Sequence, residues 1–488
     1  MSHLIEDCLI IIFNELREEP SSLYSCILVN RFWCRIAMPI LWEDPFEYDI
    51  NNGDSRSHHK LYNLIVSLLQ TSSKKLLSDN NIELPIQEFS NKPLFNYVNL
   101  SPQISSNFIN NMTKQLIKED DGFNKYQEEY KKYLLEQEIY KLFINNCKDI
   151  VHFNWKTRQP LSQFQGASTC FSQLRSLIID LQCVTSTELF AMAQICQNIE
   201  ELSVADCYGD ISGLIWFINT QKKLRSLNLY FKGTKILQCV QLSEVIERKA
   251  ATLKKLSIIG PNIILLPPKF LSSLIKLEYL ELYEQTYETE SAEMCEWKKH
   301  LLITSFPNLQ YLKTAMLTSC EYHAIIEKSI GNILEINILH MFDQDREYTN
   351  KLIKAIVEKC PKLEKLTINV ELENLDGIKG ILLNCTQLKM INLSMDNKKQ
   401  YNCDIFLEIL TNYSPKTLYE ISFNENWKFS NEGLENFFKS WRNIEPITFT
   451  MKFIGDIDEG YKRIVEKYYE KGIIKDNLLD EHVTFVQQ

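Results

Sequence analysis

The stretch LRSLNL, residues 224–229, decides the fold of this chain because its apolar pattern recurs along most of the sequence. The form LxxLxL, with apolar residues at most of its fixed positions, occurs eleven times, starting at residues 174, 199, 224, 253, 277, 309, 333, 363, 388, 418 and 444. A degenerate twelfth copy, IVHFNW, begins at Ile150, and successive copies start 24 to 32 residues apart. Self-similarity at such a period is the signature of a repeat architecture.

Each copy predicts one short strand, because its fourth and sixth residues alternate with polar ones, which is the period of a strand with one buried face. Between copies lie helical stretches such as REYTNKLIKAIVEKC, residues 346–360, whose apolar residues fall on one face. A single unit cannot bury its leucine face alone, whereas stacked units form a continuous core. We therefore predict an α/β solenoid over residues 147–488, with a curved parallel sheet inside, helices outside and about twelve repeats.

The spacing and the LxxLxL core resemble those of leucine-rich repeats. Cysteines stand three residues before the first apolar position of four copies, at Cys147, Cys196, Cys360 and Cys385, and Cys207 follows Val204 by three. This pattern is similar to the cysteine-containing subclass, which implies thiols buried near the turns. Several copies lack the cysteine, and the asparagine usual in other subclasses is missing.

The strand model assigns positions three, five and seven of each copy to the concave surface. Eleven of the twelve residues at position five are polar or charged, as a water-facing row requires. Aromatic residues gather beside this row over the copies from 224 to 309. The predicted substrate-binding residues are Tyr230, Ile259, Tyr279, Glu281, Tyr283, Tyr311 and Lys313. Exposed tyrosines suit a protein-binding patch, but tyrosines also favour strands for their own sake, so both explanations stay open.

The first 46 residues carry a different pattern, of helical period. LIEDCLIIIFNEL, residues 4–16, predicts one helix, and Pro20 ends the pattern before a second helix that Ser21 or Ser22 can cap. A third helix carries Trp33, Ile36 and Ala37. A unit of about 40 residues is near the size at which a core is marginal, so it is expected to need a partner surface.

This segment, L-x-E-x-x-L-x-x-I-F-x-x-L followed by L-x-x-C-x-x-V-N-R-x-W, resembles the F-box, although Ile5 follows Leu4 where many members have proline. The resemblance implies docking on a Skp-type adaptor, which connects to a cullin and a RING subunit. The implied adaptor-binding residues are Leu4, Ile5, Leu9, Ile12, Phe13, Leu16, Val29 and Trp33. Some of these must form the core of the unit itself, and Trp33 is the best single candidate for a contact.

Residues 47–146 predict a helical connector. The sequence of this region is polar, with charges of alternating sign. Helices are expected at Lys60–Thr71, Ser105–Ile117 and Lys125–Phe143. We interpret this region as a solvated helical segment that covers the end of the repeats, rather than as a functional charge patch.

Composition excludes several function classes. A net charge of -10 and a pI near 5.5 disfavour nucleic-acid binding. The run CLIIIF is too short to span a membrane and follows acidic residues, so we expect a cytoplasmic or nuclear protein. Fourteen cysteines without a CxxC pair predict mostly free, packed thiols, inert in the case of Cys8, Cys26 and Cys34, and no zinc or other cofactor.

Motifs for chemistry are also missing. GIKG at 377–380 is too short for a phosphate loop, and HExxH and GxSxG do not occur. The sequence therefore predicts a non-catalytic substrate-recognition subunit of a cullin-RING ubiquitin ligase, with an unknown protein substrate. One rival is a repeat scaffold with no ligase role. The other is an enzyme whose site is assembled on the concave face, where the middle row offers only Glu281 as an acid.

Overall fold

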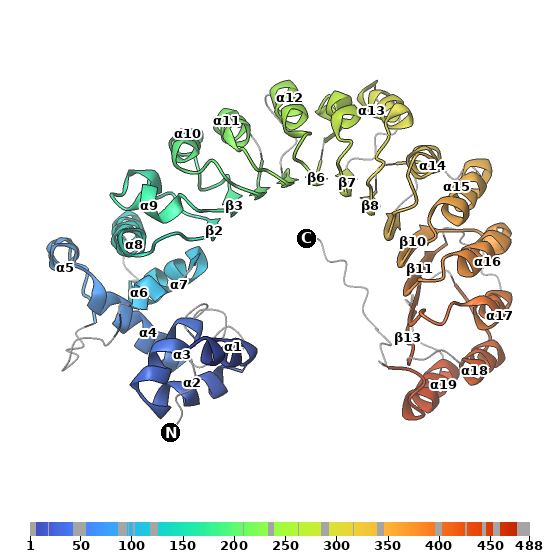
Figure 1. The fold of residues 1–488 in the computed structure, drawn as a ribbon, viewed down its shortest axis with the longest axis horizontal. Coiled ribbons are helices and arrows are strands. Elements are labelled where there is room, and N and C mark those ends of the chain that lie inside the picture. The colour runs from blue at the N-terminus through green and yellow to red at the C-terminus, as the bar shows by residue number, and fades with distance from the viewer. Residues whose placement is uncertain are drawn as a thin grey trace. The chain divides into compact units, whose positions relative to one another are not determined.

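The structure is a computed structural model, shown in Figure 1. It describes residues 6–17, 19–41, 55–85, 95, 97–100, 103–117, 125–207, 209–232, 239–261, 263–284, 292–315, 317–338, 346–395, 403–424, 427–441, 446–451 and 459–475. The chain divides into two compact units, residues 1–224 and 225–488.

Three helices open the first unit: α1 (Glu6–Glu15), α2 (Pro20–Val29) and α3 (Arg31–Leu41). Asn30 caps α3, accepting a hydrogen bond of 2.9 Å from the Trp33 backbone N–H. The predicted serine cap of the second helix is wrong, because α2 begins at Pro20 and its N-cap residue, Glu19, makes no side-chain bond. Proline suits a first turn, where its missing N–H has no helical partner.

These helices enclose a small core of their own. The buried side chains are those of Leu9, Phe13, Leu23, Ile36 and Ala37. Leu9 and Phe13 stand four residues apart and therefore share one face of α1.

The connecting region holds α4 (Ser55–Leu68), α5 (Thr71–Asp79), α6 (Tyr97–Leu100), β1 (Gln103–Ile104), α7 (Ser106–Leu116) and α8 (Lys125–Asn146). The helix predicted at Lys60–Thr71 is confirmed as α4, which begins five residues earlier and ends at Leu68, three residues before Thr71, where α5 begins. The helices predicted near residues 105–117 and 125–143 are confirmed as α7 and α8. Strand β1 was not predicted.

Twelve strands follow the twelve copies of the sequence motif. In the first unit they are β2 (His152–Trp155), β3 (Ser176–Asp180) and β4 (Glu201–Ala205), and β1 pairs with β2 to give the parallel order β1-β2-β3-β4. Helices α9 (Ala167–Phe171), α10 (Ser186–Ile195) and α11 (Ser212–Thr220) lie on one side of these strands (Figure 1).

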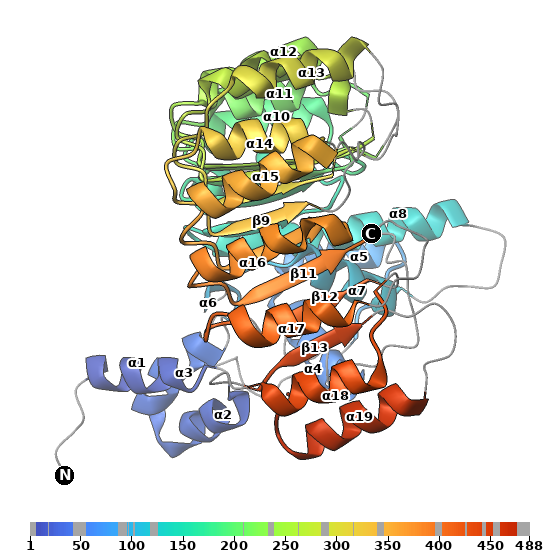
Figure 2. The same cartoon turned by 90° about the vertical axis from the view of Figure 1, so that its right-hand side faces the viewer.

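The second unit continues the same plan. Its strands, in spatial as in chain order, are β5 (Ser226–Tyr230), β6 (Lys255–Gly260), β7 (Tyr279–Glu284), β8 (Tyr311–Thr314), β9 (Glu335–Ile338), β10 (Lys365–Asn369), β11 (Met390–Ser394), β12 (Glu420–Phe423) and β13 (Thr448–Met451). Its α-helices are α12 (Cys239–Lys249), α13 (Ala292–Ile303), α14 (Ser319–Glu327), α15 (Arg346–Lys359), α16 (Leu375–Asn384), α17 (Asp404–Tyr413), α18 (Asn431–Ser440) and α19 (Glu459–Glu470). Figure 2 shows β11, β12 and β13 side by side, with α17, α18 and α19 along them.

The predicted register is confirmed. In all twelve copies the fourth and sixth residues are buried, including Thr314, which takes the sixth position of its copy. The residues between them lie on the opposite face of each strand, which we call the open face because the helices cover the other one. Ser257 is an exception in the middle row, since its small side chain is buried. The fold is that of an α/β leucine-rich-repeat solenoid.

Buried polar side chains tie successive repeats together. The thiol of Cys196 donates to the Phe171 carbonyl at 3.4 Å, and that of Cys385 donates to the Cys360 carbonyl at 3.3 Å. Gln221, buried at the end of α11, bonds to the backbone of the preceding repeat. Thirteen of the fourteen cysteines, all but Cys239, are free thiols. These groups stand at repeat junctions, where a buried backbone carbonyl or N–H needs a partner.

Candidate functional site

The three N-terminal helices leave many of their apolar side chains in solvent. Exposed large apolar side chains are those of Ile10, Ile11 and Ile12 on α1, Tyr24, Leu28 and Val29 on α2, and Phe32 on α3. We call this set the N-terminal apolar surface. Its most exposed members are Ile11 at 64% and Leu28 at 69%. Exposed apolar residues are ordinary singly, but seven on so short a segment are not.

The structure divides the predicted adaptor-binding residues into three groups. Leu9 and Phe13 are corrected to core positions, because their buried side chains pack inside the helical cluster and present nothing to a partner. Leu16 and Trp33 are half-buried against the same core. Ile12 and Val29 are exposed. Leu4 and Ile5 lie outside the described residues.

The sequence analysis missed five members of this surface: Ile10, Ile11, Tyr24, Leu28 and Phe32. The available signal was the uninterrupted run LIIIF at residues 9–13, because one helical face cannot bury five consecutive residues. Cys8, which was expected to be buried and inert, is exposed on the same helix.

A second cluster lies on the open face of the second unit. We call it the tyrosine patch; it comprises Tyr230, Lys255, Ile259, Tyr279, Glu281, Tyr283, Tyr311 and Lys313. Strand pairing sets Lys255 beside Tyr279 and Tyr279 beside Tyr311 in one row. Ser257, Glu281 and Lys313 form the next row, and Tyr230, Ile259 and Tyr283 form the third. The predicted substrate-binding residues are thus neighbours on four adjacent strands.

Glu281 is the polar centre of the tyrosine patch. Its Oε2 accepts hydrogen bonds from the Ser257 hydroxyl at 2.8 Å and from the Tyr279 hydroxyl at 3.0 Å. Its Oε1 lies 3.8 Å from Nζ of Lys313, and 22% of the Glu281 side chain is exposed. The carboxylate is therefore held in place by two neighbours while still reaching solvent.

The aromatic rings of the patch also contact each other and a cation. Tyr279 and Tyr311 have ring centroids 5.9 Å apart, and Nζ of Lys255 lies 4.5 Å from the centroid of the Tyr279 ring. Lys255 was not among the predicted residues, although its position in the copy at 253 marks the same row. Burial raises the pKa of both Tyr230 and Tyr279, and the negative charge of Glu281 raises each further.

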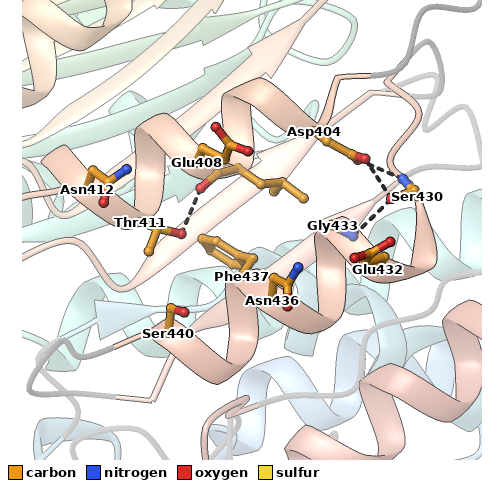
Figure 3. A pocket seen from close by; sticks show the side chains of 11 residues that line it. Asp404, Glu408, Thr411, Asn412, Ser430, Glu432, Gly433, Asn436, Phe437 and Ser440 are labelled. Atoms are coloured by element: carbon orange, nitrogen blue, oxygen red, sulfur yellow. Dashed lines mark hydrogen bonds between the residues drawn. The ribbon is translucent and has the colours of Figure 1, made fainter.

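A third feature is a cavity of about 300 Å³ between α17 and α18 on the helical side of the second unit (Figure 3). Asp404, Glu408 and Glu432 lie along it. Asp404 accepts hydrogen bonds from the Ser430 backbone N–H at 2.7 Å and its hydroxyl at 2.6 Å, and the same hydroxyl accepts from the Gly433 N–H at 2.9 Å. These polar groups serve the cap of α18.

The described part of the chain shows neither a metal-binding cluster nor a membrane-spanning helix. It contains no group of three or more His, Cys, Asp or Glu side chains that could hold a metal ion. In the same residues, every helix is too short or too polar to cross a membrane.

Comparison with known proteins gives structural likeness only. No family model matches the sequence, and no curated protein matches it significantly. A chain in the crystal structure of the Rad7 and Elc1 complex in yeast is similar with a TM-score of 0.41 and 15% identity, over 64% of this chain and 79% of that one. The leucine-rich repeat-containing protein LegL7 from Legionella pneumophila is similar with a TM-score of 0.35 and 14% identity, over 61% of this chain and 91% of that one. The fold assignment rests on the strand register of this chain itself.

Proposed function

We propose that the chain is the substrate-recognition subunit of an SCF-type cullin-RING ubiquitin ligase, in the cytoplasm or nucleus. The N-terminal helices would bind a Skp-type adaptor, and the open face of the repeats would bind a protein substrate. The observation that carries this proposal is the N-terminal apolar surface, on a segment whose sequence resembles the F-box. The resemblance to the F-box indicates a Skp-type adaptor as the partner, and the exposed apolar side chains give the physical reason why a partner should bind.

The energetics favour a covered N-terminal apolar surface. Its seven exposed side chains outnumber the five that form the core of the same helices. Removing apolar area from water stabilises a complex by roughly 25 cal/mol per Å². Aliphatic and aromatic side chains spread over α1, α2 and α3 would therefore contribute most of the binding free energy, in the manner of an amphipathic helix set against a groove.

In this role the chain supplies no acid, base or nucleophile. It would hold a substrate lysine near a thioester carried by another subunit, which raises the effective concentration of the two reactants. The exposed apolar side chains would bind the adaptor and the repeats would select the substrate, while other subunits carry out the ubiquitin transfer.

Co-expression with a Skp-type adaptor tests the proposal. The intact chain should co-purify with the adaptor, and an Ile11→Asp, Leu28→Asp variant should lose it, because both changes place a charge in a desolvated interface. Ile303→Asp is the matched control, since Ile303 is an exposed isoleucine at 73% on α13 and should leave capture intact. Capture by the double variant, or no capture by the intact chain, would contradict the proposal.

The second candidate function is a repeat scaffold that binds partners outside any ligase. The tyrosine patch favours it, because this cluster stands on strands of the second unit and owes nothing to the N-terminal helices. A scaffold would bind its partner through the patch while the intact chain failed to capture the adaptor.

A further inference from the structure

The tyrosine patch spans strands β5 to β8 in three rows. One outer row is that of Lys255, Tyr279 and Tyr311, and the other is that of Tyr230, Ile259 and Tyr283. The two outer rows are four residues apart along each strand, or roughly 13 Å at a rise of about 3.3 Å per residue. Glu281 and Lys313 lie in the middle row between them.

The middle row contains one acceptor, Oε1 of Glu281, that can take a further hydrogen bond. Oε2 of Glu281 already accepts from two hydroxyls, whereas its Oε1 has Lys313 Nζ at 3.8 Å, beyond hydrogen-bond distance. An ionised carboxylate has about four lone-pair sites, two on each oxygen, so Oε1 can accept hydrogen bonds from an incoming cation. An ion pair this long at a partly exposed site is weak, so an incoming cation competes with Lys313 on favourable terms.

The outer rows are suited to cations as well. The ring face of Tyr279 already holds an ammonium group, that of Lys255, at 4.5 Å from its centroid. The ring of Tyr230 is 42% exposed, and the charge of Glu281 reaches its hydroxyl. Aromatic faces attract cations through their quadrupole and repel anions, so the lysine over Tyr279 shows the kind of group that this patch accommodates.

We propose that the tyrosine patch binds a basic side chain of a partner polypeptide, with the cation paired to Oε1 of Glu281 and its stem against the ring of Tyr230. Arginine is the better occupant, because its planar guanidinium can stack on an aromatic ring while an N–H at its edge donates to Oε1 of Glu281. The inference rests on the proposed function only in assigning a polypeptide to the open face.

Long-range charge acts in the same direction. The chain carries a net charge of -10, which attracts a basic segment before contact is made. The two lysines of the patch keep their positive charge and oppose this attraction locally, although Lys255 is engaged with Tyr279 and Lys313 faces Glu281. An acidic segment would have to approach Glu281 itself.

Fluorescence anisotropy with labelled oligo-arginine, oligo-lysine and oligo-glutamate peptides of equal length tests the inference on the full-length chain. The oligo-arginine peptide should bind tightest. Glu281→Gln, which keeps both hydroxyl hydrogen bonds, should weaken it roughly fivefold, and Tyr230→Ala roughly threefold. Glu358→Gln, which removes one exposed charge from α15 on the helical side, is the matched control and should leave the affinity unchanged.

Three results would overturn the inference: equal losses in Glu281→Gln and Glu358→Gln, tighter binding of oligo-glutamate, or no binding of oligo-arginine to the intact chain. The first would reduce the effect to net charge. Adaptor capture by Glu281→Gln separates this test from that of the proposed function. The variant should capture a Skp-type adaptor as well as the intact chain does, so either idea can fail alone.

Discussion

The indole of Trp33 packs edge-on against the phenyl ring of Phe13, with ring centroids 5.3 Å apart and planes inclined by 65°. Phe13 is fully buried, and Trp33 covers it while remaining partly in solvent. The pair therefore belongs first to the core of the N-terminal helices. A Trp33 variant that loses a partner would report on the fold of this unit as much as on a contact.

Phe13→Ala should unfold the N-terminal helices preferentially, because a large-to-small change at a buried phenylalanine costs about 3–5 kcal/mol. Ile12→Ala, at the neighbouring exposed position, should stay within about 0.5 kcal/mol of the intact chain. Hydrogen exchange followed by mass spectrometry would show fast exchange over residues 6–41 in the first variant alone. Equal protection in the two variants would place Phe13 outside the core.

Gln221→Leu should destabilise the first unit by about 1–3 kcal/mol, because it leaves buried backbone groups without a partner. The Gln221 side chain accepts from the Ile199 N–H at 3.1 Å and donates to the Cys196 carbonyl at 3.0 Å. Lys223→Leu, two residues on at an exposed site, is the control. Urea denaturation compares them, and similar midpoints would mean that this glutamine does not hold the repeats together.

Gly260→Ala should cost about 1–3 kcal/mol through backbone strain. Gly260 has a φ of 135°, and an added Cβ would lie 2.1 Å from the Phe231 carbonyl oxygen. Gly209→Ala offers a comparison, since its φ of 67° is also left-handed but no atom lies within 4 Å of the added Cβ. Thermal unfolding should separate the two, with Gly260→Ala the less stable; the reverse order would remove the steric argument.

Alkaline pH should destabilise the fold through its buried thiols. Burial raises the pKa of Cys147, Cys196 and Cys385 from 9.0 to about 12 in each case. Between these values the unfolded chain loses protons that the folded chain retains, so stability is full below pH 9 and falls as the pH rises toward 12. Denaturant titrations across this range should show a falling midpoint.

Thiol labelling provides the matching readout at lower pH. In the native chain near pH 8, exposed Cys8 and Cys295 should react with a thiol reagent, whereas Cys147, Cys196 and Cys385 should react only after denaturation. Fast native labelling of the buried three would show that the repeat junctions open.

The repeat register was predictable because each copy of the motif carries the same alternation of apolar and polar residues, and the motif recurs twelve times. Alternation of period two places Leu256 and Ile258 in the core whatever the rest of the chain does, and a slip of one residue would expose both. The same reasoning placed the residues of the tyrosine patch in neighbouring rows. The sequence could not give the contacts within the patch. The hydrogen bond from the Ser257 hydroxyl to Glu281 and the contact of Lys255 with the Tyr279 ring depend on which strands are adjacent and in what register.

The sequence by itself determined the class of fold, the number of repeats and the buried face of the twelve repeat strands, since period and alternation are properties of consecutive residues. Only the tertiary structure decided that the three isoleucines of α1 are exposed while Leu9 and Phe13 are buried, and that Phe13 lies beneath Trp33. The physical reason is that a run of apolar residues fits several helical faces equally well. The packing of α1 and α2 against α3 selects one face for the core and leaves the others to water.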